Sequence, residues 1–295
     1  MSTYLITGAT GGLGSSALKH LSKSVDTSEI AVLVRDAESE KAKSYKEKGY
    51  ELRVADYDNK EALVAAFKNI DALYFVSGSD IPSREPQHKN VVEAAKEAVV
   101  KHVVYTSAGR KDDSKDSPVA MVMDAHIKTE NWLKESGLDY TILRHNLYAE
   151  VLPMFLGDKE ALLGSRTIFL PTETGKTGFA LRDDLAEAGM IVLKNYKNHT
   201  NRVYTLDGPK AIDFKEITSI LSTITSEEIE FISPDAETFK STMVSYGVPE
   251  EAIGMMLVFS LGIAAGEFNS ESNDLEVLLG RKPKPVSDLL DQVYG

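Results

Sequence analysis

A glycine-rich stretch near the start of the chain has residue types and spacing that suit a phosphate group. It follows the apolar segment Tyr4–Thr7 and precedes a segment with helical spacing of apolar residues. Glycine leaves backbone N–H groups unobstructed, and the following helix adds the positive end of its dipole. The spacing Gly-x-x-Gly-x-x-Gly differs from the common Gly-x-Gly-x-x-Gly and is not specific by itself. Because a strand precedes it and a helix follows it, we predict a site for a dinucleotide pyrophosphate; the alternative is a structural turn. The stretch consists of Gly8, Ala9, Thr10, Gly11, Gly12, Leu13 and Gly14.

The residues after the second apolar segment, Ile30–Val34, indicate which dinucleotide binds. An acidic residue at this point binds ribose hydroxyls, whereas an arginine pairs with a ribose phosphate. The chain has Arg35 followed by Asp36. A guanidinium forms charge-assisted bonds to phosphate, so we expect NADPH rather than NADH. The alternatives are a surface arginine and an aspartate that caps the next helix.

Two further places suit a cofactor. Ser77, Gly78 and Ser79 follow the fourth apolar segment and are small enough for the backbone to pass close to a ligand, and Asp56 after the third segment is placed to meet an adenine. Serines that form a turn and an aspartate that ends a strand are the structural alternatives.

The elements that must position these residues alternate between short apolar strands and amphipathic helices over the first half of the chain. This alternation predicts an α/β fold with a Rossmann-type, doubly wound parallel sheet. The expected strands are 4–7, 30–34, 52–55, 72–77, 103–106 and 140–143.

After about residue 150, glycine and proline interrupt the pattern, which indicates a second unit. We expect a dinucleotide-binding domain over 1–150, extended by a returning strand near 203–206, and a smaller, mainly helical substrate-binding lobe over 151–295. Its helices are expected near 214–224, 235–246 and 250–261, with one strand at 229–232, and a cleft for substrate between lobe and sheet edge.

Composition excludes several function classes. The 295 residues include 33 basic and 45 acidic side chains, a net charge of −12 that disfavours nucleic acid as a partner. There is no cysteine, no apolar run of about 18 residues and no basic, apolar leader, so we expect a cytoplasmic protein without a membrane span. The six histidines lack the short spacing of a metal site, so we expect no metal. The oligomeric state stays open, with a homodimer as one expectation.

Several segments together resemble one family, the NmrA-like branch of the atypical short-chain dehydrogenases. They are Ile6–Gly14, Val34–Arg35, Ala55–Tyr57, Thr106–Ser107, Thr141–Arg144 and Leu278–Arg281. Within that branch, Pro86–His88 and Arg144–Glu150 are most similar to the NADPH-dependent quinone oxidoreductases of bacteria. The resemblance covers nearly the whole chain. It implies that the cofactor is bound by Gly8 to Leu13, by Arg35, by Ser77 to Ser79, and, beside the nicotinamide, by His145, Asn146, Leu147, Tyr148, Ala149 and Glu150.

The chain departs from the wider superfamily at the catalytic pair. Typical members use Tyr-x-x-x-Lys, in which lysine lowers the tyrosine pKa for proton exchange. Here those positions hold Val122 and His126. A histidine near the nicotinamide is either a proton donor or a buried hydrogen-bonding residue, and Asn146 and Tyr148 either orient an acceptor carbonyl or line a pocket.

A quinone suits a site without that pair, because its reduction restores aromaticity and delocalises the developing oxyanion. We therefore expect hydride transfer from NADPH to a quinone-like small molecule, with Asn146, Tyr148 or His126 bonding the reduced oxygen. The alternative function is a redox sensor that binds dinucleotide without turnover, and a third is reduction of a carbon–carbon double bond or another carbonyl.

Overall fold

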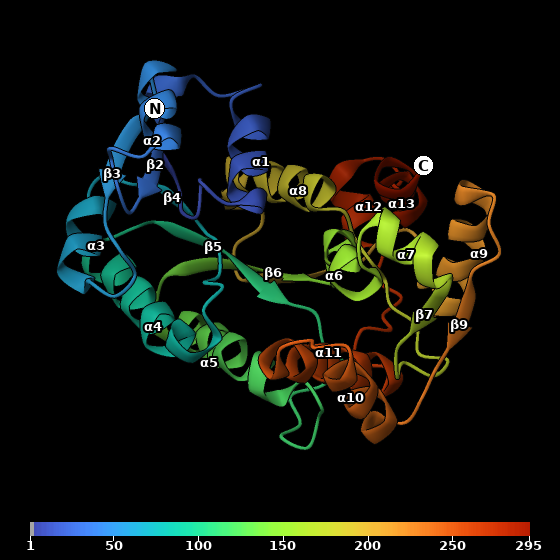
Figure 1. Cartoon of the computed structure of the whole chain (residues 1–295). Helices are drawn as coiled ribbons and strands as arrows, with labels where there is room; N and C mark the ends of the chain where they lie inside the picture. Colours follow the sequence, from blue (N-terminus) through green and yellow to red (C-terminus); the bar gives the residue numbers. More distant parts are fainter. Residues whose placement is uncertain (1–2) are drawn as a thin grey trace.

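The computed structural model describes residues 3–295, and its centre is a seven-stranded parallel sheet. The strand order is β3-β2-β1-β4-β5-β6-β8 (Figure 1). The sheet order therefore reverses direction between β1 and β4, where a doubly wound fold leaves a crevice at the carboxyl ends of its strands. The strands are β1 (Tyr4–Ile6), β2 (Ile30–Val34), β3 (Glu51–Val54), β4 (Ala72–Phe75), β5 (His102–Ala108), β6 (Asp139–His145) and β8 (Arg202–Leu206).

Both faces of the sheet are covered by helices, which is why β2 and β4 are apolar and buried along their whole length. One face packs against α1 (Gly12–Leu21), α2 (Glu40–Glu47), α8 (Arg182–Lys194) and α12 (Asp274–Leu279). The other face packs against α3 (Lys60–Phe67), α4 (Ile81–Glu97) and α5 (Ala120–Ser136). The expected doubly wound α/β fold is confirmed.

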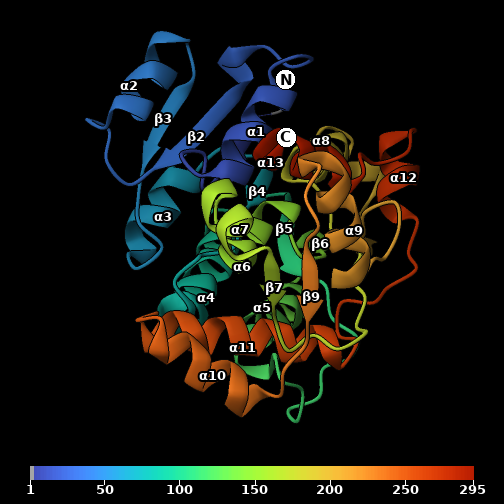
Figure 2. The ribbon, with the colours of Figure 1, turned by 45° about the vertical axis from the view of Figure 1, so that its right-hand side comes forward.

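A second apolar core lies in the C-terminal part of the chain. It is built around a two-stranded parallel sheet, β7 (Thr167–Phe169) with β9 (Glu230–Ile232). The helices of this lobe are α6 (Leu152–Leu156), α7 (Lys159–Ser165), α9 (Phe214–Thr225), α10 (Ala236–Ser245), α11 (Glu250–Ala264) and α13 (Val286–Tyr294). The α10–α11 pair lies beside the start of α5 (Figure 2). A Cβ on Gly262 of α11 would collide with Val119, so the lobe covers the sheet domain closely at this point.

The second half contains more regular structure than its sequence pattern indicated. The returning strand β8 is present, but α8 also returns to the sheet domain, where it packs along α1. Helices α6, α7, α12 and α13 and strand β7 are short and lie between glycines and prolines, which obscured their periodicity. No helix within residues 3–295 is both long and apolar enough to cross a bilayer.

Candidate active site

The glycine-rich turn joins β1 to α1 at the reversal point of the sheet. Gly8 adopts a left-handed backbone (φ +60°) that favours glycine, and its carbonyl accepts a 2.9 Å hydrogen bond from the Gly11 N–H. A Cβ on Gly14 would collide with the Gly8 carbonyl, so α1 can approach the turn only with glycine there. The N-cap residue Gly11 has no side chain to bond the first N–H groups of α1, which leaves these donors for a ligand.

Side chains of α2 hold the other side of this turn. The Tyr45 hydroxyl donates to the Ala9 carbonyl at 2.7 Å, and the Lys41 ammonium donates to the Thr10 carbonyl at 2.6 Å. Leu13 is buried in the core and fixes the first turn of the helix. The carbonyl groups are thus bonded by the protein while helix N–H groups stay open, an arrangement that fits a dinucleotide phosphate.

The residues expected around the adenosine lie at the carboxyl ends of β2 and β3. Arg35 is exposed and makes no hydrogen bond or ion pair with any residue from 3 to 295, so its guanidinium is available to a ligand. Asp36 does not cap α2, because its carboxylate accepts from the Glu38 N–H and Ser39 is the cap. Asp56 is half-buried and accepts from the backbone two residues later.

The loop after β4 is held by hydrogen bonds to its backbone. The Ser77 N–H donates to the Thr106 hydroxyl at 2.9 Å, and the Gly78 N–H donates to His88 Nε2 at the same distance. His88 is therefore a neutral imidazole that donates from Nδ1 to the Thr129 hydroxyl. Its burial lowers the pKa to about 3. These bonds fix the loop wall at this sheet edge, with Ser77 and Gly78 half-buried.

A buried arginine of α4 contacts α5 at the two positions, Val122 and His126, where typical members of the superfamily have the Tyr–Lys pair. Arg84 of α4 donates from Nε to the Gly78 carbonyl at 2.7 Å and from Nη1 to the Val122 carbonyl at 3.3 Å. Nη1 also lies 3.3 Å from Nε2 of His126. Arginine has only donors, so His126 Nε2 accepts and its Nδ1–H points at the Tyr105 hydroxyl, 2.7 Å away.

This arrangement leaves His126 without a free nitrogen. Burial, and then the charge of Arg84, hold its pKa well below the usual value, so the ring is neutral. Arg84 Nη2, by contrast, has no hydrogen-bond partner in the described part of the chain. Arg84 therefore keeps one free donor, Nη2, and no carboxylate within residues 3–295 is bonded to its guanidinium.

The loop after β6 carries the remaining expected residues. Asn146 is buried, and its amide donates to the Asp207 carboxylate at 2.7 Å and to the Phe268 carbonyl at 2.9 Å. Its Oδ1 accepts from the Leu147 N–H, so the whole amide group is bonded within the protein. The Leu147 carbonyl and the Ala149 N–H both bond the backbone of residue 180. This loop is thus anchored to two later segments of the chain.

Tyr148 and His145 face each other in the same loop. The Tyr148 hydroxyl lies 3.2 Å from His145 Nδ1, and burial lowers the pKa of this imidazole to about 3. Burial also raises the pKa of Tyr148 to about 12, so its hydroxyl stays protonated. On the other side of the Tyr148 ring, the guanidinium of Arg182 lies 5.0 Å from the ring centroid. The Glu150 carboxylate accepts from the Arg182 N–H at 2.9 Å and so caps α8.

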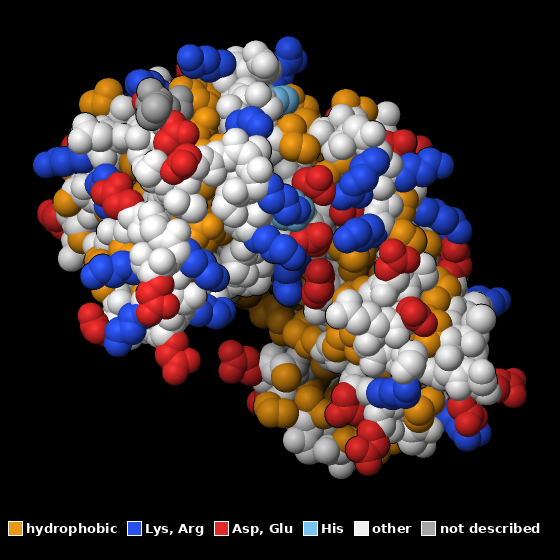
Figure 3. Space-filling model, turned by 90° about the horizontal axis from the view of Figure 1, so that it is seen from above, with side chains coloured by type: hydrophobic (Ala, Val, Ile, Leu, Met, Phe, Trp, Pro, Cys, Tyr) orange, Lys and Arg blue, Asp and Glu red, His pale blue; other side chains and the backbone are white. Residues whose placement is uncertain are grey.

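A hollow opens between the sheet domain and the C-terminal lobe, with hydrophobic side chains at its inner end (Figure 3). The apolar helix α11 contributes half-buried side chains to the lobe core, among them Met255, Met256 and Phe259, and Ile81 at the start of α4 packs against the same core. Arg84 follows Ile81 by one turn of α4, so an apolar part of the lobe core begins one turn before it.

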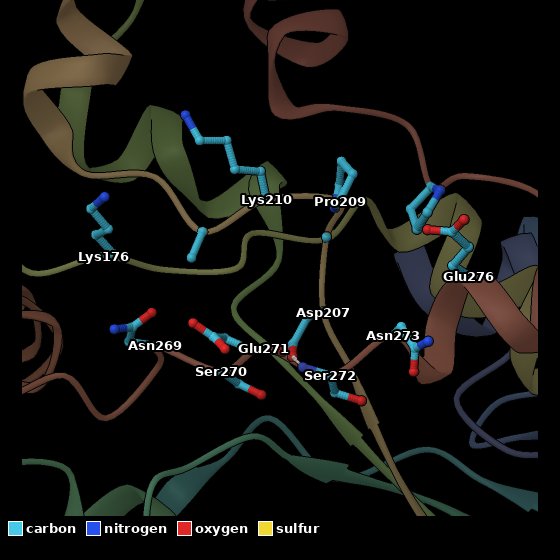
Figure 4. A pocket seen from close by; sticks show the side chains of 13 residues that line it. Lys176, Asp207, Pro209, Lys210, Asn269, Ser270, Glu271, Ser272, Asn273 and Glu276 are labelled. Carbon is cyan, nitrogen blue, oxygen red and sulfur yellow. Dashed lines mark hydrogen bonds between the residues drawn. The ribbon is translucent and has the colours of Figure 1, made fainter.

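A separate polar pocket of about 560 Å³ is lined mainly by residues 207–211 and 269–273 (Figure 4). Asp207, which bonds Asn146, lines this pocket. Its two lysines, Lys176 and Lys210, share the carboxylate of Glu216. Residues of the glycine-rich turn do not line this pocket.

Comparison with known proteins agrees with this geometry. The model of the NmrA-like family matches residues 1–284. The chain belongs to the NmrA-like family. Quinone oxidoreductase 2 of Escherichia coli is 31% identical over 98% of both chains. An NmrA-like family domain-containing oxidoreductase of Aspergillus flavus is 33% identical over 98% of this chain and 94% of its own.

Solved structures of NmrA-like reductases superpose over the whole chain. The NADPH-dependent quinone oxidoreductase of E. coli, complexed with NADPH, has a TM-score of 0.91 at 30% identity and covers 99% of this chain and 100% of its own. The triphenylmethane reductase of Citrobacter, complexed with NADP(H), has a TM-score of 0.88 at 31% identity, with 99% of each chain covered.

Two residues of this NmrA-like site escaped the sequence analysis. Arg182 lies over the Tyr148 ring of the loop after β6, Arg84 bonds the loop after β4 and α5, and each arginine lies within the first turns of a helix. Arg84 precedes Pro86–His88, which drew attention only through the resemblance. The start of α8 lies in the segment where glycine and proline had obscured the pattern, and no local signal marks Arg182.

Proposed function

We propose that this protein is an NADPH-dependent reductase that transfers a hydride to a quinone or a similar aromatic carbonyl acceptor. NADPH is supported by the open glycine-rich turn and the unpaired guanidinium of Arg35, together with the cofactors of the similar structures. Bound NADPH supplies the hydride. The acceptor class is supported by the quinone oxidoreductases among the relatives and by the chemistry of the residues around Arg84.

The observation that carries the proposal is the replacement of a proton donor by a permanent cation. Arg84 stays protonated at all working pH values, so it stabilises a negative oxygen but does not give up a proton. His126 is neutral and bonded at both nitrogens, which makes it a positioning residue for Arg84. A quinone matches this site because its reduced oxygen is a stable, delocalised anion, whereas a simple ketone needs a proton at once.

The loop after β6 has a positioning role in this proposal. Asn146 fixes the backbone of the loop through Asp207 and the Phe268 carbonyl. The Tyr148 hydroxyl stays protonated around neutral pH. It lies within hydrogen-bond distance of His145, whose imidazole is uncharged. We assign Tyr148 to the orientation of the acceptor or of the nicotinamide amide, and the apolar side chains of α11 to the rest of the acceptor.

The test is nicotinamide absorbance after purified protein is mixed with NADPH or NADH and a panel of simple quinones, aromatic aldehydes and enones. We expect quinone-dependent loss of NADPH that is faster than with NADH and faster than the uncatalysed reaction. Turnover of enones or aldehydes alone would reject the acceptor class. Tight binding of dinucleotide without turnover of any acceptor would reject the enzyme in favour of a sensor.

A further inference from the structure

Arg182 lies directly on the glycine-rich turn, although 168 residues separate it from the end of that turn at Gly14. Its Cδ and Nη1 are both 3.6 Å from the point where a Cβ on Gly12 would be. Gly12 is the first residue of α1, and Arg182 is the first residue of α8. The two helices pack along each other, so their N-termini meet at the turn (Figure 1). Two positive helix ends and one guanidinium thus converge on one point.

The guanidinium of Arg182 is not paired with a carboxylate in the described part of the chain. It forms no hydrogen bond or ion pair within residues 3–295, and it lies beside Gly12 and over the Tyr148 ring. The two aspartates that follow it are both occupied. Asp183 accepts from Ser16 and His20, and Asp184 accepts from Arg281 and from the Lys284 N–H.

Glu150 is a third carboxylate that contacts this residue. Glu150 accepts from the backbone N–H of Arg182 and not from its guanidinium. This bond holds the first residue of α8 in place while the side chain stays free to lie over the turn. The backbone of Arg182 is therefore held in place, its guanidinium lies over the Tyr148 ring, and no counter-ion within residues 3–295 is bonded to it.

We propose that Arg182 binds the pyrophosphate of the dinucleotide above the glycine-rich turn while it stacks on Tyr148, and so connects phosphate binding to the loop at the nicotinamide end. This inference rests on the dinucleotide part of the proposed function. A guanidinium is planar and bonds two phosphate oxygens at once, which an ammonium does not. Pyrophosphate is common to NADPH and NADH, so Arg182 contributes to both, whereas Arg35 contributes to NADPH alone.

The experiment measures the dissociation constants of NADPH and NADH by nicotinamide fluorescence, without any acceptor. The variant Arg182→Gln should weaken both cofactors about tenfold or more and by the same factor, because the charge-assisted bonds to the pyrophosphate are lost in each complex. Arg182→Lys keeps the charge and should lie between Arg182→Gln and the parent. Arg35→Gln should weaken NADPH alone, and Arg202→Gln, an exposed arginine at the start of β8, should change neither.

The link to Tyr148 has its own pair of variants. Tyr148→Leu removes the ring and should weaken both cofactors about threefold more than Tyr148→Phe, which keeps the ring beside the guanidinium and removes only the hydroxyl. Thermal melts establish that each variant is folded. An Arg182→Gln protein that binds both cofactors within twofold of the parent would overturn the proposal, as would a loss confined to NADPH. Because acceptors are absent from the assay, failure of the quinone assignment would leave these outcomes unaffected.

Discussion

Replacing Arg84 by methionine removes the cation while keeping a side chain of similar length in an apolar setting. In the structure Nε and Nη1 are bonded to the Gly78 and Val122 carbonyls, and Nη2 is the donor left for an acceptor oxygen. A hydrogen bond to a charged group contributes about 1.5–3 kcal/mol. Loss of this bond from the transition state should therefore lower kcat/KM for a quinone roughly 10- to 150-fold.

The assay is steady-state oxidation of NADPH across a range of quinone concentrations and pH values. Because arginine does not titrate in this range, the parent should show no acidic group that switches activity between pH 6 and 9, and the variant should show the same flat profile at a lower level. The Gly78 carbonyl and His126 Nε2 lose a donor, which should cost about 1–3 kcal/mol of unfolding free energy. NADPH affinity should stay within about threefold, since the arginine is assigned to the acceptor.

The matched control is Lys128→Met, which removes one positive charge from α5 nearby. Lys128 is partly exposed and pairs with Glu85 and Asp124, outside the network of Arg84. It should keep the parent activity and stability, because exposed ion pairs contribute little. A folded Arg84→Met enzyme with kcat/KM within threefold of the parent would refute the role of the cation. Arg84→Lys provides a second reading if the methionine variant does not fold.

Further predictions concern the cofactor, the turn and the histidines. Arg35→Glu should weaken NADPH about tenfold or more while NADH changes little, and equal losses in binding measurements for both would reject NADPH selectivity. Gly14→Ala should abolish dinucleotide binding and lower the melting temperature, because the new Cβ meets a backbone carbonyl of the same turn; a crystal structure with an unchanged turn would contradict this. Burial lowers the pKa of His88 and His145 to about 3 and that of His102 to about 4. Each histidine is neutral in the fold but takes up a proton below about pH 6.5 when unfolded, so stability is full above that pH and falls as the pH drops towards 4. His126 is neutral in the fold as well, so the proton uptake on denaturant unfolding should rise from about one at pH 7 to about four at pH 5, and an uptake that stays below one at pH 5 would mean that these rings are solvated.

The parallel sheet follows from sequence because each strand is a short apolar run with turn residues beside it. Segments such as 30–34 lie between helices on both sides, so their pattern is continuous and local. The glycine-rich turn is predictable for the same reason, since its strand, turn and helix are consecutive. Local order in the chain is also local order in space at this end of the fold.

The site beyond the turn depends on contacts that no local pattern records. Asn146 is polar and follows a strand, which predicts a site residue, but only the structure reveals that Asp207 and Phe268 use its whole amide group. His126 is similar, because its neutral state depends on Arg84, 42 residues earlier. The guanidinium of Arg182 has no partner within residues 3–295. Sequence spacing does not predict this, because Arg182 and the turn that it contacts are 168 residues apart in the chain.

The anchoring of Asn146 has a consequence for the order in which the protein matures. The loop after β6 is tied to a carbonyl at residue 268, which the ribosome releases long after the strands of the sheet. A growing chain can therefore assemble β1 to β6 and bury much of their apolar surface while the Asn146 amide lacks its partner. The nascent protein acquires a sheet early, whereas the loop after β6 gains this anchor only once residue 268 has been made.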